Sequence, residues 1–92
     1  MNKIRMHLII EGRVQGVWFR DSTRHTANRL GVYGWVKNRP DKTVEVVVEG
    51  LEEKVEEFVA WCHEGPPAAR VAQVHETREV WQGEFDSFEI VF

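Results

Sequence analysis

The sequence lacks the features that mark several large classes of protein. One cysteine, Cys62, occurs in 92 residues, so the chain cannot form an internal disulfide and does not need an oxidising compartment to fold. No apolar run approaches the ~20 residues of a membrane span, and no signal-like apolar stretch opens the chain. The 12 basic residues are outnumbered by 15 acidic ones, and the net charge of −3 disfavours a nucleic-acid partner. We therefore expect a cytoplasmic protein that engages neither a membrane nor a nucleic acid.

The residues that are present suit one globular domain. With 42% hydrophobic and 29% charged residues, the composition excludes a disordered tail and a collagen-like repeat. A chain of this length buries roughly 60–65% of its unfolded surface, which is enough for one core but not for two. We predict a single domain over residues 1–92, and nothing in the sequence demands more than a monomer.

Hydrophobic periodicity predicts the order of strands and helices. Residues 4–11 alternate between apolar and polar, as a half-buried strand does. The clearest helical stripe consists of Leu51, Val55, Phe58, Val59 and Cys62. Residues 71–80 alternate imperfectly, which indicates a bulge or a twisted edge strand. In chain order, we predict strands over 4–11, 32–38, 43–49, 71–80 and 88–92, with helices over 21–30 and 51–62.

Short polar and glycine signals set the expected ends of these elements. Asp21 or Ser22 can cap the first helix, and Gly31 supplies its stop. Residues 39–42 form a short turn, so the strands on either side of it should pair as an antiparallel hairpin. Gly50 is expected to end the third strand.

This order of elements predicts an α+β fold, the ferredoxin-like βαββαβ sandwich. Two right-handed crossovers place both helices on one face of an antiparallel sheet. A short extra C-terminal strand follows this core, with Phe88, Ile90 and Phe92 on the same side.

The most informative segment lies between Gly12 and Arg20, where a glycine-bearing loop leads directly into the first helix. A loop that feeds a helix N-terminus directs several unpaired backbone N–H groups at one point, which makes an anion site. Arg20 lies at the positive end of the helix dipole, where a cation is unfavourable unless an anion binds beside it. Gly12 and Gly16 let the loop curl, but the glycine spacing matches neither a P-loop nor a dinucleotide-binding motif. The local sequence therefore predicts a phosphate site.

Several segments of the chain resemble the acylphosphatases. They are Gly12-Arg-Val-Gln-Gly-Val-Trp-Phe-Arg20, Gly34-Trp-Val-Lys-Asn38, Gly65-Pro66-Pro67 with Arg70-Val71, and the closing Phe88-Glu-Ile90. The first two are specific motifs, and their order and separation strengthen the resemblance. Together these segments extend the match over essentially the whole chain.

The resemblance implies hydrolysis of acyl phosphates to a carboxylate and inorganic phosphate, without a metal or an organic cofactor. It implies that Arg20 binds the phosphate together with backbone amides of the loop, whose other members are Val14, Gln15, Gly16, Val17, Trp18 and Phe19. It also implies that Asn38 holds the attacking water. No protein base is evident, so a phosphate oxygen is the candidate acceptor for the proton of that water. The family often has glycine where this chain has Asp41-Lys42, so either Lys42 accepts the backbone angles of that turn or the turn type differs.

The remaining reactive side chains favour structural roles. The four histidines, His7, His25, His63 and His75, show no metal-ligand spacing. Cys62 lies on the apolar helix stripe, as a core thiol does. Among the tryptophans, Trp18 is the candidate for the pocket mouth, where an indole can contact an aryl or alkyl acyl group.

Two other functions are compatible with the same order of elements. An RNA-recognition module stacks bases on exposed aromatic side chains of its central strands. Here the expected outward residues of the first and third strands are Arg5, His7 and Ile9, and Glu45, Val47 and Glu49. A regulatory domain could instead retain the anion site and bind phosphate without cleaving its substrate. An assay of phosphate release separates these alternatives, whereas the physiological acyl group cannot be inferred from the sequence.

Overall fold

The computed structural model describes residues 2–92, and Met1, the first residue of the predicted domain, lies outside the described residues. In chain order the elements are β1 (Lys3–Arg13), α1 (Phe19–Leu30), β2 (Tyr33–Asn38), β3 (Val44–Leu51), α2 (Glu52–Glu64), β4 (Arg70–Glu79) and β5 (Phe88–Ile90). The predicted order of strands and helices is confirmed. Neither helix within residues 2–92 is long and apolar enough to cross a membrane.

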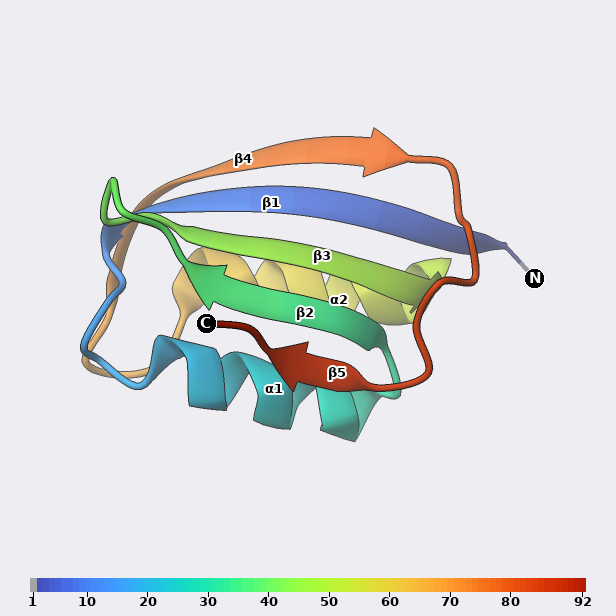
Figure 1. Ribbon diagram of the computed structural model, residues 1–92, viewed down its shortest axis with the longest axis horizontal. Coiled ribbons are helices and arrows are strands. Elements are labelled where there is room, and N and C mark those ends of the chain that lie inside the picture. The colour runs from blue at the N-terminus through green and yellow to red at the C-terminus, as the bar shows by residue number, and fades with distance from the viewer. Residues whose placement is uncertain (1) are drawn as a thin grey trace.

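The strands form one five-stranded sheet in the order β4-β1-β3-β2-β5. β1 pairs antiparallel with both β3 and β4, and β2 pairs antiparallel with β3. β5 adds to the outer edge of β2 in the parallel direction, so the complete sheet is mixed. Both helices lie behind the sheet in Figure 1, packed against one face. This is the ferredoxin-like sandwich that the sequence predicts.

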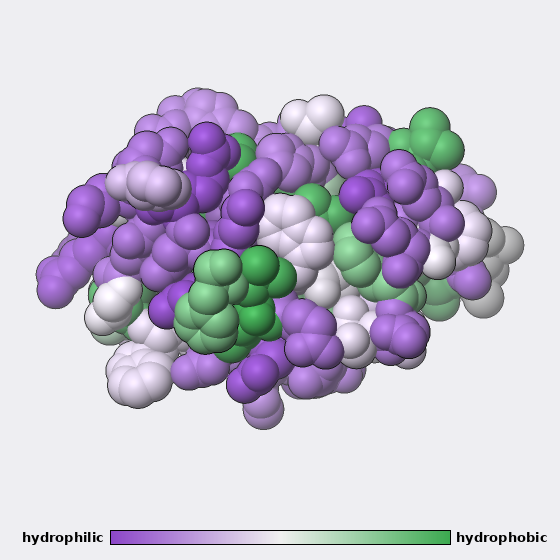
Figure 2. All heavy atoms as spheres, viewed as in Figure 1, coloured by the Kyte–Doolittle hydropathy of each residue, from purple (hydrophilic) through white to green (hydrophobic). Residues whose placement is uncertain are grey.

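The face of the sheet turned away from the helices is largely hydrophilic (Figure 2). On it, Arg5 and His7 of β1 lie opposite Glu49 and Val47 of β3. The outward aromatic side chains, Tyr33 and Trp35, belong to β2 instead of the two central strands. The described face therefore lacks the aromatic platform on β1 and β3 that an RNA-recognition module uses.

The start of α1 differs from the prediction. Neither Asp21 nor Ser22 caps this helix, which begins at Phe19 after Trp18 as its N-cap, with no side-chain hydrogen bond to the cap. Trp18 has a φ of 65°, a left-handed conformation that bulky residues rarely adopt. The preceding loop fixes the backbone before the polar residues are reached, and this overrides their local capping preference. Gly31 ends the helix as predicted.

The junction between β3 and α2 also differs, because β3 ends two residues later than the predicted strand over 43–49. β3 runs past Gly50 to Leu51, because Gly50 still pairs with Ile4 of β1. Leu51 is then the N-cap of α2, so strand and helix join without a loop. The glycine marks the junction but not the last residue of the strand.

The β2–β3 turn shows how the chain accommodates Lys42. Lys42 has a φ of 76°, so the turn does demand the left-handed conformation that favours glycine. Its N–H donates to the Arg39 carbonyl at 3.1 Å, and the Arg39 N–H donates to the Thr43 carbonyl at 2.9 Å. The Asp41 carboxylate accepts from the backbone N–H of Thr43 at 3.1 Å and from its hydroxyl at 2.6 Å. The predicted antiparallel hairpin is confirmed, and its turn is held by its own hydrogen bonds.

The core fills the space between the sheet and the helices. The predicted helical stripe is buried except at Leu51, which ends β3 and is half-buried, and Val55, Phe58 and Cys62 are fully enclosed. Burial, and to a lesser degree Glu76, raises the pKa of the Cys62 thiol far above its usual range. Cys62 is therefore a core residue, as predicted, and a poor nucleophile.

Candidate active site

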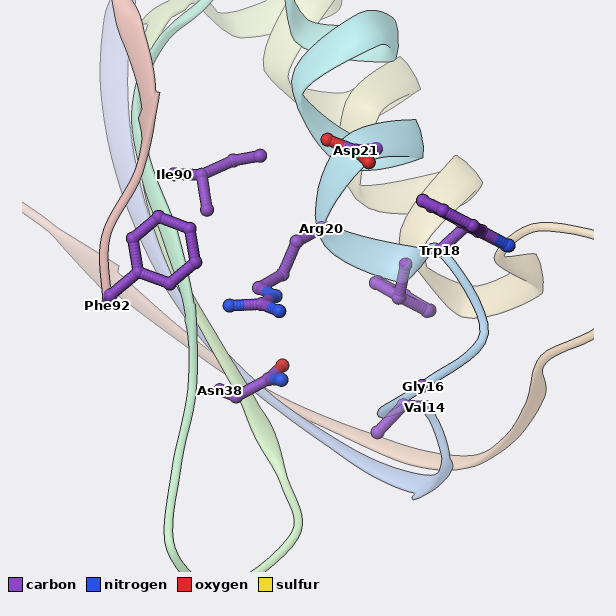
Figure 3. Close-up of a pocket in the computed structure, with 9 residues that line it drawn as sticks. Val14, Gly16, Trp18, Arg20, Asp21, Asn38, Ile90 and Phe92 are labelled. Atoms are coloured by element: carbon purple, nitrogen blue, oxygen red, sulfur yellow. The ribbon is translucent and has the colours of Figure 1, made fainter.

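A cavity of about 330 Å³ opens where the loop after β1 meets the start of α1 and the end of β2 (Figure 3). Three separate parts of the chain contribute its lining, which consists of Val14, Gly16, Trp18, Phe19, Arg20, Asp21, Asn38, Ile90 and Phe92. The structure thus brings Arg20 and Asn38 together in one cavity with much of the predicted phosphate loop.

Two glycines shape the loop that borders this cavity. Gly12 has a φ of 128° and lies where the register between β1 and β4 shifts. A Cβ atom at Gly12 would lie 2.1 Å from the carbonyl oxygen of Arg70, so β4 approaches too closely for any side chain. Gly16 has a φ of 73°, which glycine adopts without a steric cost. These positions let the chain leave the sheet and turn back into α1.

The loop leaves a row of backbone N–H groups without acceptors in the chain. The first hydrogen bond of α1 runs from the Ser22 N–H to the Trp18 carbonyl at 3.0 Å. Within residues 2–92, none of the hydrogen bonds uses a backbone N–H of residues 15–20 as donor. The helix dipole adds a partial positive charge at the same end of α1. Such a group of donors suits an anion with several oxygens.

Arg20 lies in the first turn of α1 without an acidic partner among the described residues. The adjacent acid, Asp21, pairs with Arg24 at 3.6 Å. The guanidinium carbon of Arg20 lies 5.0 Å from the ring centroid of Phe92, a cation–π distance. Figure 3 shows the guanidinium directed into the cavity, toward Asn38. An arginine with its donors exposed to a cavity can bind two phosphate oxygens at once.

Asn38 is the last residue of β2, and its side chain enters the cavity from the side opposite the loop (Figure 3). Its Oδ1 atom is buried and has no hydrogen-bond partner within residues 2–92. A buried polar atom normally has a partner, because leaving it unpaired costs about 1–3 kcal/mol. An acceptor oxygen kept at that cost can hold a water or a ligand group in a fixed place.

Two of the predicted loop residues direct their side chains elsewhere. The side-chain amide of Gln15 donates to backbone carbonyls of the β2–β3 turn. The side chain of Val17 is buried in the hydrophobic core. Neither side chain lines the cavity, so these residues can contribute only backbone amides to it.

Three lining residues lie outside the predicted site, namely Asp21, Ile90 and Phe92. The alternation of Phe88, Ile90 and Phe92 indicates that these side chains share a face. It does not reveal that β5 lies beside β2, where Ile90 pairs with Val36. A parallel pairing between segments so far apart in sequence leaves no local signal.

The cavity contains few groups that could transfer a proton. Asp21 has the one acidic side chain among the described residues that line it. Three histidines instead contact glutamates outside the cavity: His7 with Glu45, His63 with Glu76, and His75 with Glu11. No group of three or more His, Cys, Asp or Glu side chains within residues 2–92 is placed to hold a metal ion. The arrangement therefore relies on hydrogen-bond donors and positive charge.

The family model and the curated relatives agree on one family. The family model described as Acylphosphatase matches residues 6–90. An acylphosphatase of Pelotomaculum thermopropionicum is 50% identical over 92 residues, which are 100% of this chain and 100% of the relative. One from Thiobacillus denitrificans is 56% identical over 84 residues, 91% of this chain and 92% of the relative. The crystal structure of acylphosphatase from Bacillus subtilis matches with a TM-score of 0.93 at 35% identity, covering 97% of this chain and 99% of that one.

Proposed function

The chain belongs to the acylphosphatase family and hydrolyses acyl phosphates, and from this premise we propose how its own residues carry the reaction. Arg20 and the backbone amides of residues 14–20 bind the phosphoryl group, and Asn38 holds the attacking water. One observation carries the proposal: within residues 2–92, a single cavity gathers an arginine that is not paired with a carboxylate, backbone amides without acceptors and a buried oxygen without a donor.

Hydrolysis of this substrate requires little acid–base catalysis from the protein. An acyl phosphate is a mixed carboxyl–phosphate anhydride, and its leaving group is a carboxylate that needs no strong general acid. The costly step is to bring water in line with an anionic phosphoryl group while charge moves among its oxygens. Donors fixed in advance around those oxygens lower that barrier without reorganising during the reaction. Arg20 and the loop amides are donors of this kind.

Asn38 supplies the second half of the site. Its Oδ1 accepts a hydrogen bond from the water, whose oxygen then attacks phosphorus as the bond from phosphorus to the acyl oxygen breaks. The water proton passes to a non-bridging oxygen of the phosphate, and the acyl group leaves as a carboxylate. An uncharged amide suits this role because a carboxylate in its place would repel the phosphate.

The acyl group faces the apolar part of the cavity mouth. Trp18 is 77% exposed, and Ile90 and Phe92 lie on the other side of Arg20 (Figure 3). These side chains expose little polar surface, so they can contact an alkyl or aryl group while the phosphate binds below. They select for size and apolar character and not for one particular acid.

The test is phosphate release from benzoyl phosphate, with inorganic phosphate as a competitive inhibitor. Arg20→Gln should lower kcat/KM by about 10³-fold or more, since one donor fixed in advance is typically worth ~3–4 kcal/mol in the transition state. Arg29→Gln, an exposed arginine on the same helix, is the matched control and should keep full activity. Full activity of Arg20→Gln would refute the assignment of the phosphate site. Phosphate binding without turnover in the wild type would instead indicate a binding domain.

We further propose that the chain acts as one monomeric domain in the cytoplasm. The single cysteine and its burial support folding in a reducing compartment. Light scattering at concentrations used for the assay tests the monomer. A dimer whose specific activity does not change on dilution would refute the monomer and leave the proposed roles of Arg20 and Asn38 unaffected.

A further inference from the structure

Gln15 carries the only hydrogen bonds between the phosphate loop and the β2–β3 turn within residues 2–92. Its Nε2 donates to the carbonyl oxygen of Arg39 and to that of Thr43, both at 2.9 Å. An amide nitrogen has two hydrogens, so both of its donors are used. The acceptors lie 24 and 28 residues further along the chain. One partly buried side chain thus ties two distant segments together.

The two accepting carbonyls belong to the turn that carries Asn38. Arg39 directly follows Asn38, and Thr43 directly precedes Val44, the residue with which Asn38 pairs. This turn already has its own closing bond between the Arg39 N–H and the Thr43 carbonyl. Gln15 is therefore not required to close the hairpin. What its amide adds is a fixed spacing between the turn and the loop.

Asn38 depends on that spacing because no hydrogen bond of the described chain orients its side chain. Its Oδ1 is without a partner, so the backbone at the end of β2 determines where the amide lies. The phosphoryl group, in turn, is placed by the loop to which Gln15 itself belongs. A rigid link between these two segments sets the distance from the water to the phosphorus.

We propose that Gln15 is a positioning residue for the hydrolysis: it holds the Asn38 end of β2 at the correct distance from the phosphate loop. This inference rests on the roles proposed above for Arg20 and Asn38. Misplacing a reacting group by about 1 Å can cost ~10²-fold in rate, so the loss of a two-bond link is large enough to measure. Glutamate cannot replace this residue, because its carboxylate has no N–H donor and would face two carbonyl oxygens. Asparagine is one methylene too short to reach both.

The experiment is a double-mutant cycle between Gln15→Leu and Asn38→Ala, with benzoyl phosphate as substrate and spontaneous hydrolysis subtracted. Gln15→Leu alone should lower kcat by about 10–100-fold and change the inhibition constant for inorganic phosphate by less than about threefold. In the Asn38→Ala background, the same substitution should change kcat by less than about twofold, because the positioned group is already gone. Gln73→Leu, at an exposed glutamine of β4, is the matched control.

Each outcome decides the question. Equal losses from Gln15→Leu in both backgrounds, unchanged kcat, or a loss that shows only as weaker phosphate inhibition would overturn the positioning role. Should Gln15→Leu fail to fold in a thermal unfolding scan, Gln15→Asn is assayed in its place with the same expected pattern. If Asn38→Ala itself keeps full kcat, the role proposed for Asn38 fails, and the inference about Gln15 falls with it. If Asn38→Ala lowers kcat but the losses from Gln15→Leu and Asn38→Ala are additive, the inference about Gln15 fails and the role proposed for Asn38 stands.

Discussion

Two arginines show the difference between holding a fold together and building a site. Arg5 lies near the start of β1, and Arg20 lies in the first turn of α1, at the opposite end of the sheet. Arg5 contacts three carboxylates, those of Glu49 at 3.3 Å, Glu79 at 2.8 Å and Glu84 at 2.8 Å. Arg20 contacts no carboxylate within residues 2–92 and faces a cavity. The first arginine is neutralised by the chain itself, whereas the second needs an anion from outside.

The two regions nevertheless contain the same types of hydrogen-bond donor. Glu49 is bound by backbone N–H groups and an arginine, and the cavity offers the same groups. Its buried carboxylate accepts from the backbone N–H groups of Gln82 at 2.7 Å and Glu84 at 2.9 Å, and from Arg5. Burial alone would raise the pKa of Glu49, but these donors outweigh it and hold the pKa below its usual value. Backbone amides and an arginine thus already bind one anion in this protein. Near Arg20, the same types of donor have no acceptor from the chain, and this is what makes them available to a substrate.

The largest effect that separates the two regions is expected from Asn38→Ala. It should lower kcat by about 10²–10³-fold, because a positioned water and its electrostatic support are lost. The free energy of unfolding should stay the same or rise by about 1 kcal/mol, since a buried oxygen without a partner is removed. Rates with benzoyl phosphate and urea unfolding measure both quantities. Asn28→Ala, at an exposed position of α1, should change neither.

The reverse pattern is expected for Glu49→Gln. The new amide nitrogen would face a backbone N–H, so the variant should lose about 2 kcal/mol of unfolding free energy. For a domain of this size, that corresponds to roughly 10 °C in Tm. The kcat below the transition should remain that of the wild type, because the cavity is at the other end of the sheet. Glu79→Gln removes a more exposed partner of Arg5 and should cost far less. A loss of activity in Glu49→Gln without a loss of stability would show that the two regions are coupled.

Acid should weaken the Arg5 region by protonating Glu49. Because the pKa of Glu49 is lower in the folded state than in the unfolded state, its stabilisation is complete above the ordinary glutamate range, near ~4.3. That stabilisation is lost as the pH falls from there through the lowered pKa. We expect Glu49 to contribute a fall of up to about 1.4 kcal/mol per pH unit in the unfolding free energy in this window. Urea unfolding between pH 6 and pH 3 should give a shallower fall for Glu49→Gln, and an identical pH dependence would contradict the assignment.

The sequence predicts those features of the fold and the site that depend on local sequence patterns. The alternation of 4–11 and the stripe of α2 predict the order of the elements, because burial on one face repeats with the period of each element. The motifs around Arg20 and Asn38 predict the members of the site. The glycine that the family often has in this turn indicates that Lys42 takes a demanding backbone position, and the structure shows Lys42 in the left-handed conformation.

The parts that it does not predict depend on contacts between distant segments. Asp21 is a good capping residue by type, yet the loop makes Trp18 the N-cap and leaves the amides free. Nothing near Phe92 indicates that its ring lies against Arg20. The side chain of Gln15 is another case, since its acceptors are backbone carbonyls, which any residue type provides. The structural propensities of neighbouring residues carry no information about such distant partners.

The smallest effect that we expect distinguishes two tryptophans, one in each region. Trp81 lies near the Arg5 region with Lys3 at 5.1 Å from its ring, whereas Trp18 is 77% exposed at the cavity mouth. Trp18→Ala should raise KM for benzoyl phosphate by about fivefold, roughly 1 kcal/mol of aromatic contact, while KM for acetyl phosphate changes less than twofold. Trp81→Ala should instead lower Tm and leave both KM values unchanged. Equal KM shifts for the two substrates in Trp18→Ala would mean that the indole supports the loop and not the acyl group, since only a contact with the acyl group can tell an aryl from a methyl substituent.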